Sequence, residues 1–240
     1  MRALTNVFAV ARRELGSYFS TPLAYIVTAL FLAINGLLFY ASLGNSPQAT
    51  IQPVVSTVMT VLLLLAPVLS MRLLAEEQRS GTLELLLTAP VRDGEVVVGK
   101  FVAALGLLAV MLGLTLLYPA ILFAYGQPDP GEVLGGYLTM VLFGGAAMAI
   151  GLFASSLTQN QIVAAVIAFA VLLVLWVLDT VTQAIGGTIG SVLSYLAVDP
   201  HQIDVSLGVV DTKDLIYYVS LIVGALFLTT RSLEARRWRG

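Results

Sequence analysis

The sequence predicts an all-α polytopic membrane protein whose six transmembrane helices form a single transmembrane domain, residues 1–240. Hydrophobic residues occupy 58% of the positions and charged residues only 11%, whereas soluble domains carry about 25% charged residues. Uncharged runs extend over 15–71, 101–128, 133–178 and 215–230. Because one crossing needs about 20 predominantly apolar residues, these runs are long enough to span a bilayer.

Turn-forming residues divide the uncharged runs into individual spans, because clusters of Gly, Pro, Asn and Ser mark the places where a chain leaves the bilayer. Such clusters occupy residues 44–47, 127–131 and 155–161, and Pro53 opens the second helix. We therefore expect transmembrane helices at 22–43, 54–74, 97–125, 132–157, 162–185 and 215–231.

Two further segments are expected to lie outside the spans. Residues 4–20 place apolar side chains around Arg12 and Arg13, which predicts an amphipathic helix on the inner membrane surface. The first span, 22–43, is longer than the apolar core of a cleaved signal peptide, so we expect it to remain as a signal anchor. Residues 186–214 form an outer segment that is longer than a turn, and part of it is expected to re-enter the membrane.

Basic residues predict the orientation, because Lys and Arg are retained on the cytoplasmic side of a membrane. With the N-terminus inside, six spans place eleven of the twelve basic residues in the cytoplasm, and only Lys213 lies outside. An odd number of spans would move the Arg-rich C-terminal tail to the opposite side. We therefore expect a multi-pass protein of the plasma (inner) membrane with both termini in the cytoplasm.

Composition and spacing argue against catalysis by this chain. It has no Cys and one His, which excludes thiolate metal sites and Cys nucleophiles. Residues 94–100 match the spacing G-x-x-x-x-G-K of a phosphate-binding loop, but Phe101 replaces the Ser or Thr that would hold Mg²⁺. We interpret Lys100 instead as an anchor at the inner end of the third span. No catalytic residue, bound cofactor, metal ion or nucleic acid is expected.

The segment between the second and third spans, 76–95, is the most informative stretch of the chain. It contains a short helix-prone piece, residues 82–89, with three leucines on one face. Gly81 permits a tight turn before this piece and Pro90 ends it. A short amphipathic helix of this kind suits docking into a groove of another protein. An ordinary interfacial loop helix explains the same pattern.

This segment resembles the coupling-helix signature of ABC-2 type permeases, the membrane subunits of ATP-binding-cassette (ABC) exporters. The resemblance rests on Glu77-x-x-x-Gly81-Thr82-Leu83-Glu84-x-Leu86-Leu87-x-x-Pro90, followed by Gly99-Lys100. The N-terminal block Arg13-Glu14-Leu15-x-x-Tyr18-Phe19-x-x-Pro22-x-x-Tyr25 resembles the gliding-motility-type subfamily of these permeases.

The resemblance implies an ABC-2 (type V) exporter fold in which a short cytoplasmic coupling helix fits a cleft of a separate ATPase. It also implies eight ATPase-coupling residues: Glu77, Gly81, Thr82, Leu83, Glu84, Leu86, Leu87 and Pro90. The partners would be ABC ATPase subunits that hold ATP-Mg, a second permease as homodimer or heterodimer, and the lipid bilayer.

The expected function is that of a non-catalytic permease subunit, which moves a substrate across the membrane with ATP hydrolysed by a separate ATPase. The alternative is a membrane anchor or assembly platform for an ATPase in a motility- or secretion-related complex, without transport of its own. Two of the polar residues inside the expected spans are Asn35 and Asp179. Asn35 is interpreted as a helix-packing residue, and Asp179 as either a functional group or a hydrated residue near the interface. The substrate is not indicated.

Overall fold

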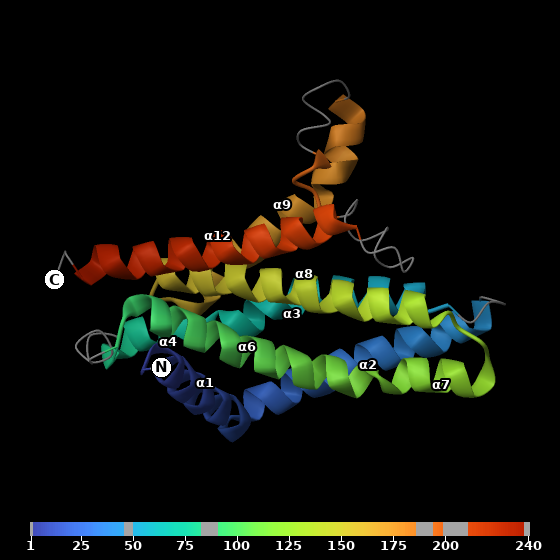
Figure 1. Ribbon diagram of the computed structural model, residues 1–240, viewed down its shortest axis with the longest axis horizontal. Helices are drawn as coiled ribbons and strands as arrows, with labels where there is room; N and C mark the ends of the chain where they lie inside the picture. Colours follow the sequence, from blue (N-terminus) through green and yellow to red (C-terminus); the bar gives the residue numbers. More distant parts are fainter. Residues whose placement is uncertain (1, 46–49, 83–90, 186–193, 199–210, 238–240) are drawn as a thin grey trace.

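The computed structural model describes residues 2–45, 50–82, 91–185, 194–198 and 211–237, and all the long elements in this part of the chain are helices. Most of them run along one long axis, and α9 diverges from the others toward its C-terminal end (Figure 1). The helices are α1 (Arg2–Ser20), α2 (Pro22–Asn45), α3 (Gln52–Ser70), α4 (Arg72–Ser80), α6 (Asp93–Thr115), α7 (Leu117–Tyr125), α8 (Pro130–Leu157), α9 (Gln161–Ile185) and α12 (Thr212–Arg237).

Six helical stretches among the described residues are long and apolar enough to cross a membrane, which confirms the predicted fold class. They are Pro22–Leu43, Gln52–Ser80, Asp93–Tyr125, Pro130–Leu157, Gln161–Leu178 and Thr212–Arg236. The second and third stretches are longer than the expected spans 54–74 and 97–125. As a result, both ends of the segment 76–95 are helical, the first in α4 and the second in α6.

Side-chain caps and prolines set several helix ends. Asp129 accepts a hydrogen bond from the backbone N–H of Gly131 at 2.8 Å, and Pro130 occupies the first position of α8, where a missing N–H costs nothing. Asn160 accepts from the N–H of Ile162 at 2.9 Å and caps α9 in the same way. These polar caps lie where the sequence predicts turns.

Two of the spans contain a break. Pro67 lies inside α3 and has no N–H to donate, and Met71, which keeps helical backbone angles, separates α3 from α4. A second interruption at Leu116 separates α6 from α7, and Pro119 follows within the first turn of α7. The two prolines thus lie near the breaks at the ends of α3 and α6. Transmembrane helices tolerate such breaks where neighbouring helices satisfy the freed backbone groups.

Helix α8 forms the core of the described bundle. In its most apolar stretch of 18 residues, 78% of the residues are buried. It packs against α3, α6, α9 and α12. Glycines allow this close approach: a Cβ at Gly136 would lie 2.6 Å from Val55 Cγ2, and one at Gly144 would lie 2.6 Å from Leu108 Cδ2. By contrast, only 22%, 17% and 22% of the residues in the corresponding stretches of α2, α9 and α12 are buried. Most of the surface of these three helices is therefore available to lipid.

Helix α1 is the amphipathic helix expected at 4–20, and one of its faces packs against α6. The packing is tight because α6 offers glycines: a Cβ at Gly99 would lie 2.7 Å from Val10 Cβ, and one at Gly106 would lie 2.9 Å from Leu15 Cδ2. On the outer face, Leu4 and Phe8 are 76% and 70% exposed. The inner face of α1 therefore belongs to the bundle, and the outer face is apolar enough to meet lipid.

Candidate functional site

Helix α4 connects the second span to the segment in which the sequence places the ATPase-coupling residues. It continues from α3 after the break at Met71 and ends at Gly81, which has a φ of 71°. Glycine adopts this left-handed conformation without the steric cost that a Cβ would bring. Of the described residues, only Gly81 has a positive φ. The chain thus turns sharply at the position where the sequence predicts a tight turn.

Three of the eight expected coupling residues lie in this described region. Glu77 is in α4, Gly81 ends it, and Thr82 follows, with its Oγ1 atom 2.8 Å from the Oγ atom of Ser80. The remaining five lie outside the described residues: Leu83, Glu84, Leu86, Leu87 and Pro90. Their contact with an ATPase therefore stays a prediction.

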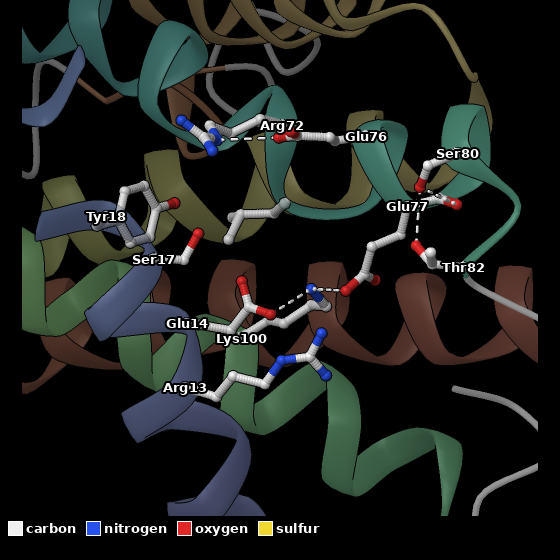
Figure 2. Close-up of a pocket in the computed structure, with 11 residues that line it drawn as sticks. Arg13, Glu14, Ser17, Tyr18, Arg72, Glu76, Glu77, Ser80, Thr82 and Lys100 are labelled. Atoms are coloured by element: carbon white, nitrogen blue, oxygen red, sulfur yellow. Dashed lines mark hydrogen bonds and ion pairs between the residues drawn. The ribbon is translucent and has the colours of Figure 1, made fainter. Parts of the chain in front are cut away.

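Glu77 takes part in a cluster of three charged side chains from three helices (Figure 2). The Nζ atom of Lys100, on α6, lies 2.9 Å from Oε1 of Glu77 on α4 and 3.0 Å from Oε1 of Glu14 on α1. The Lys100 side chain is 1% exposed, and each carboxylate side chain is 16% exposed. We call these three residues the Lys100 cluster.

The burial of the Lys100 cluster makes its pairing necessary. A charged group removed from water is costly unless an opposite charge and hydrogen bonds replace the lost hydration. The Lys100 ammonium has three donors and satisfies one oxygen of each carboxylate. Oε2 of Glu77 is buried without a hydrogen-bond partner among the described residues. Two carboxylates thus share one ammonium, and the three charges sum to one negative charge.

A polar cavity of about 220 Å³ adjoins the Lys100 cluster, and its walls come from α1, α4 and the start of α6. Arg13 of α1 and Arg72 of α4 line it together with the cluster (Figure 2). Arg72 pairs with Glu76 at 3.1 Å and donates to the hydroxyl of Thr21 at 3.4 Å. Most of the charges around the cavity are therefore already engaged in ion pairs, either within α4 or between Lys100 of α6 and the carboxylates of α1 and α4.

Tyr18 supplies another link between α1 and the second span. Its hydroxyl donates to the backbone oxygen of Leu69 at 3.1 Å. Burial raises the pKa of Tyr18, so the side chain remains the neutral donor that this bond requires. Glu14 and Tyr18 are four residues apart in α1 and lie on one face of the helix.

The opposite side of α4 is attached to the end of α8 through Ser155. Because the break at Met71 separates α4 from α3, the first N–H groups of α4 need acceptors outside the helix. Ser155 Oγ accepts from the N–H groups of Leu74 and Ala75 at 3.0 and 2.9 Å, and it donates to the oxygen of Met71 at 2.7 Å. Gln78 strengthens this attachment by donating to the backbone oxygen of Ser156 at 3.0 Å.

The same end of α8 also binds α12. The backbone oxygen of Ser156 accepts hydrogen bonds from Arg236 at 3.2 Å and from Ser232 at 3.4 Å. Sequence reasoning treats residues 155–161 as a plain turn and misses this junction. A run of small hydroxyl residues at the end of an apolar helix, Ser155-Ser156, is the signal that points to it.

The structure corrects the interpretation of Lys100 as an anchor at a membrane surface. Helix α6 begins at Asp93, so Lys100 lies two turns inside it and faces α1 and α4. Residues 94–100 are all helical, which does not match the loop that cradles a phosphate. Asn35, expected to be a helix-packing residue, is buried, and its Nδ2 atom donates to the backbone oxygen of Phe31 of its own helix at 2.7 Å.

Comparison with known proteins places this architecture in a family. The model of the family described as ABC-2 family transporter protein matches residues 8–192. A stretch of 87 residues is 33% identical to the "Probable multidrug ABC transporter permease YbhR" of Escherichia coli strain K12, and equally to that of Escherichia coli O157:H7. This stretch covers 36% of the chain and 23% of each relative. Because the family model spans more than half of the sequence, the chain belongs to the ABC-2 family of transporter proteins.

Proposed function

We propose that this chain is the membrane permease of an ATP-driven ABC exporter and that a separate ATPase supplies the energy. The observation that carries the proposal is the ABC-2 family match over residues 8–192, together with six candidate spans. In this arrangement α4 and the residues after Gly81 face the cytoplasm. Both termini lie on that side of the plasma membrane, and a second permease completes the pathway.

The geometry around α4 supports such coupling. A docking segment transmits force only if its base is held by the membrane domain, because a loosely tethered helix would move without displacing the spans. The base is held on two sides, by Lys100 on α6 and by Ser155 on α8. Gly81 then directs the chain away from α4 toward the five expected coupling residues from Leu83 to Pro90.

Glu77 has a different role in this proposal from the one that the resemblance implies. Its carboxylate is bonded to Lys100 and is largely buried, so it supports α4 from inside. The apolar face of Leu83, Leu86 and Leu87 would then supply most of the docking energy, and Glu84 would add at most about 1 kcal/mol if it formed a surface ion pair.

The direct test is the ATPase activity of the assembled complex. The tagged chain would be co-expressed with an ABC ATPase and a second permease chosen from the neighbouring reading frames of its genome, and the complex would be purified and reconstituted in lipid vesicles. We expect Leu87→Asp to lower the ATPase rate while membrane insertion stays normal, because it places a charge on the apolar docking face. Leu87→Met keeps that face apolar and is the matched control. An equal ATPase rate in the wild type and Leu87→Asp would contradict ATPase coupling through this segment.

A second assay asks whether ATP hydrolysis moves a cargo. By likeness to the multidrug permease of Escherichia coli, lipophilic dyes and drugs are the first compounds to test. Uptake into inside-out vesicles that requires ATP and stops with vanadate would establish export. The N-terminal block of residues 13–25 favours a gliding-motility-type permease within the family, so lipid-linked cargo is the next class to test. ATP hydrolysis without movement of either class would favour the anchor or assembly-platform role.

A further inference from the structure

We propose that Lys100 makes α4 move as one rigid body with α1 and α6, so that a displacement of the chain after Gly81 is passed directly to α6. The inference rests on the proposed function, in which an ATPase pushes on that part of the chain. It assigns Lys100 as a positioning residue that acts through the two carboxylates it holds.

The packing of the helices shows why one side chain can have this effect. Helix α4 packs mainly against α8 and α9, and α1 packs mainly against α6, which in turn packs against α8. Between these two groups, at the α4 end of the bundle, the Lys100 ammonium contacts Glu77 at 2.9 Å and Glu14 at 3.0 Å. It therefore joins a helix of the first group to both helices of the second.

The chemistry of the cluster makes this connection stiff. Exposed ion pairs exchange readily with water and contribute little, whereas Lys100 is 1% exposed, so water has little access to its donors. Without the ammonium, Glu14 and Glu77 would lose the positive charge that they share. Loss of Lys100 would thus remove the ionic contact that links α1 to α4.

The remaining contacts indicate which helices would separate. Tyr18 and Thr21 continue to hold the C-terminal end of α1 through Leu69 and Arg72. Val10 stays in close contact with Gly99, so α1 and α6 remain together. The opening would therefore occur between α4 and the pair formed by α1 and α6, at the Glu14 end of the cavity.

Pulsed electron paramagnetic resonance tests this rigid-body arrangement, and the absence of Cys from the chain makes every introduced label unique. Arg12→Cys, Arg79→Cys and Val98→Cys place exposed labels on α1, α4 and α6, outside the Lys100 cluster. Three doubly labelled chains are made, with labels at residues 12 and 79, at residues 79 and 98, and at residues 12 and 98. Each is measured in the ATPase-bound complex without nucleotide and with ATP trapped by vanadate.

In the otherwise wild-type chain we expect the three distance distributions to be the same in both nucleotide states. In Lys100→Met we expect the label at residue 79 to move away from the other two. The distributions of its distances to the labels at residues 12 and 98 broaden and shift to longer values. The distance between the labels at residues 12 and 98 keeps a narrow distribution. The ATPase rate of the assembled complex falls about fivefold or more, which corresponds to the lower limit of typical coupling between sites. The amount of ATPase that copurifies stays unchanged, because the docking residues are intact.

Two results would overturn the inference. One is a nucleotide-dependent change in the 12–79 distance of the wild type, a measurement that needs no variant of the cluster. The other is an unchanged, narrow 12–79 distribution in Lys100→Met. If the proposed function is wrong, no ATPase copurifies with the wild-type chain. The distances between the labels in the isolated chain then still show whether Lys100 joins α4 to α1.

Discussion

Gly151 of α8 faces Ser70 of α3 so closely that a Cβ on Gly151 would lie 1.8 Å from the Ser70 Oγ atom. The Ser70 hydroxyl is fixed in that place, since it donates to the oxygen of Ala66 at 2.6 Å and is fully buried. The second span and the central helix therefore meet at a contact that leaves no room for a methyl group.

Gly151→Ala should consequently destabilise the helix bundle by about 1–3 kcal/mol, the usual cost of overpacking a filled core. Thermal unfolding of the detergent-solubilised protein measures this effect. Gly224→Ala is the matched control, because nothing lies within 4 Å of a Cβ at that position. The contact would be less tight than we describe if both variants unfolded at the wild-type temperature.

Ser155→Ala should destabilise the junction of α4 and α8 by about 1–2 kcal/mol, because the N–H groups of Leu74 and Ala75 would lose their acceptor. Ser156→Ala controls for the loss of a hydroxyl at the same helix end. Its Oγ atom donates only to Phe153 of its own helix among the contacts we describe, at 2.7 Å. We expect a clearly smaller effect there, and equal effects would argue against a capping role for Ser155.

Lys100→Met should lower the stability of the isolated chain by about 3–5 kcal/mol, because two buried carboxylates lose their counter-ion. The triple variant Lys100→Met/Glu14→Gln/Glu77→Gln removes all three charges and should recover most of that loss. Chemical or thermal unfolding compares the two. A triple variant as unstable as the single one would indicate that packing of the lysine side chain, and not its charge, is what matters.

Tyr18→Phe should cost about 1 kcal/mol through loss of the hydrogen bond to Leu69. Tyr25→Phe removes a comparable bond at an exposed position, to the oxygen of Phe19, and should cost less. Because burial raises the Tyr18 pKa in the folded chain, its contribution to stability is present below about pH 10 and falls at higher pH, where the unfolded chain ionises first. Unfolding temperatures measured on both sides of pH 10 should therefore decline less steeply in Tyr18→Phe.

The sequence is sufficient to predict the spans, because about 20 apolar residues in succession have few other stable environments. It is less informative about where the helices end. Hydropathy falls at the charged residues near Glu76 and Asp93, yet α4 extends past Glu76 to Ser80 and α6 already begins at Asp93. They do so because Ser155 caps the start of α4, and because Glu95 accepts from the N–H of Arg92 at 3.2 Å and from Asn6 at 2.9 Å.

The Lys100 cluster could not be predicted from spacing, because its members are 86 and 23 residues apart in the chain. A lone lysine near the end of an apolar helix is ordinarily a surface anchor. Only the close packing of α1 on α6, which depends on Gly99, turns this one inward. The resemblance to ABC-2 permeases assigned Glu77 an outward role, and the contact of this region with an ATPase stays a prediction.

The bond between Ser155 and the start of α4 also constrains how the protein is made. Leu74 and Ser155 are 81 residues apart, so the ribosome has inserted the second span long before the acceptor for its N–H groups exists. At about 5–20 residues per second, this interval lasts several seconds. During synthesis the N–H groups of Leu74 and Ala75 therefore gain this acceptor only after residue 155 is made, and a nascent chain halted before that residue would lack the cap at the start of α4.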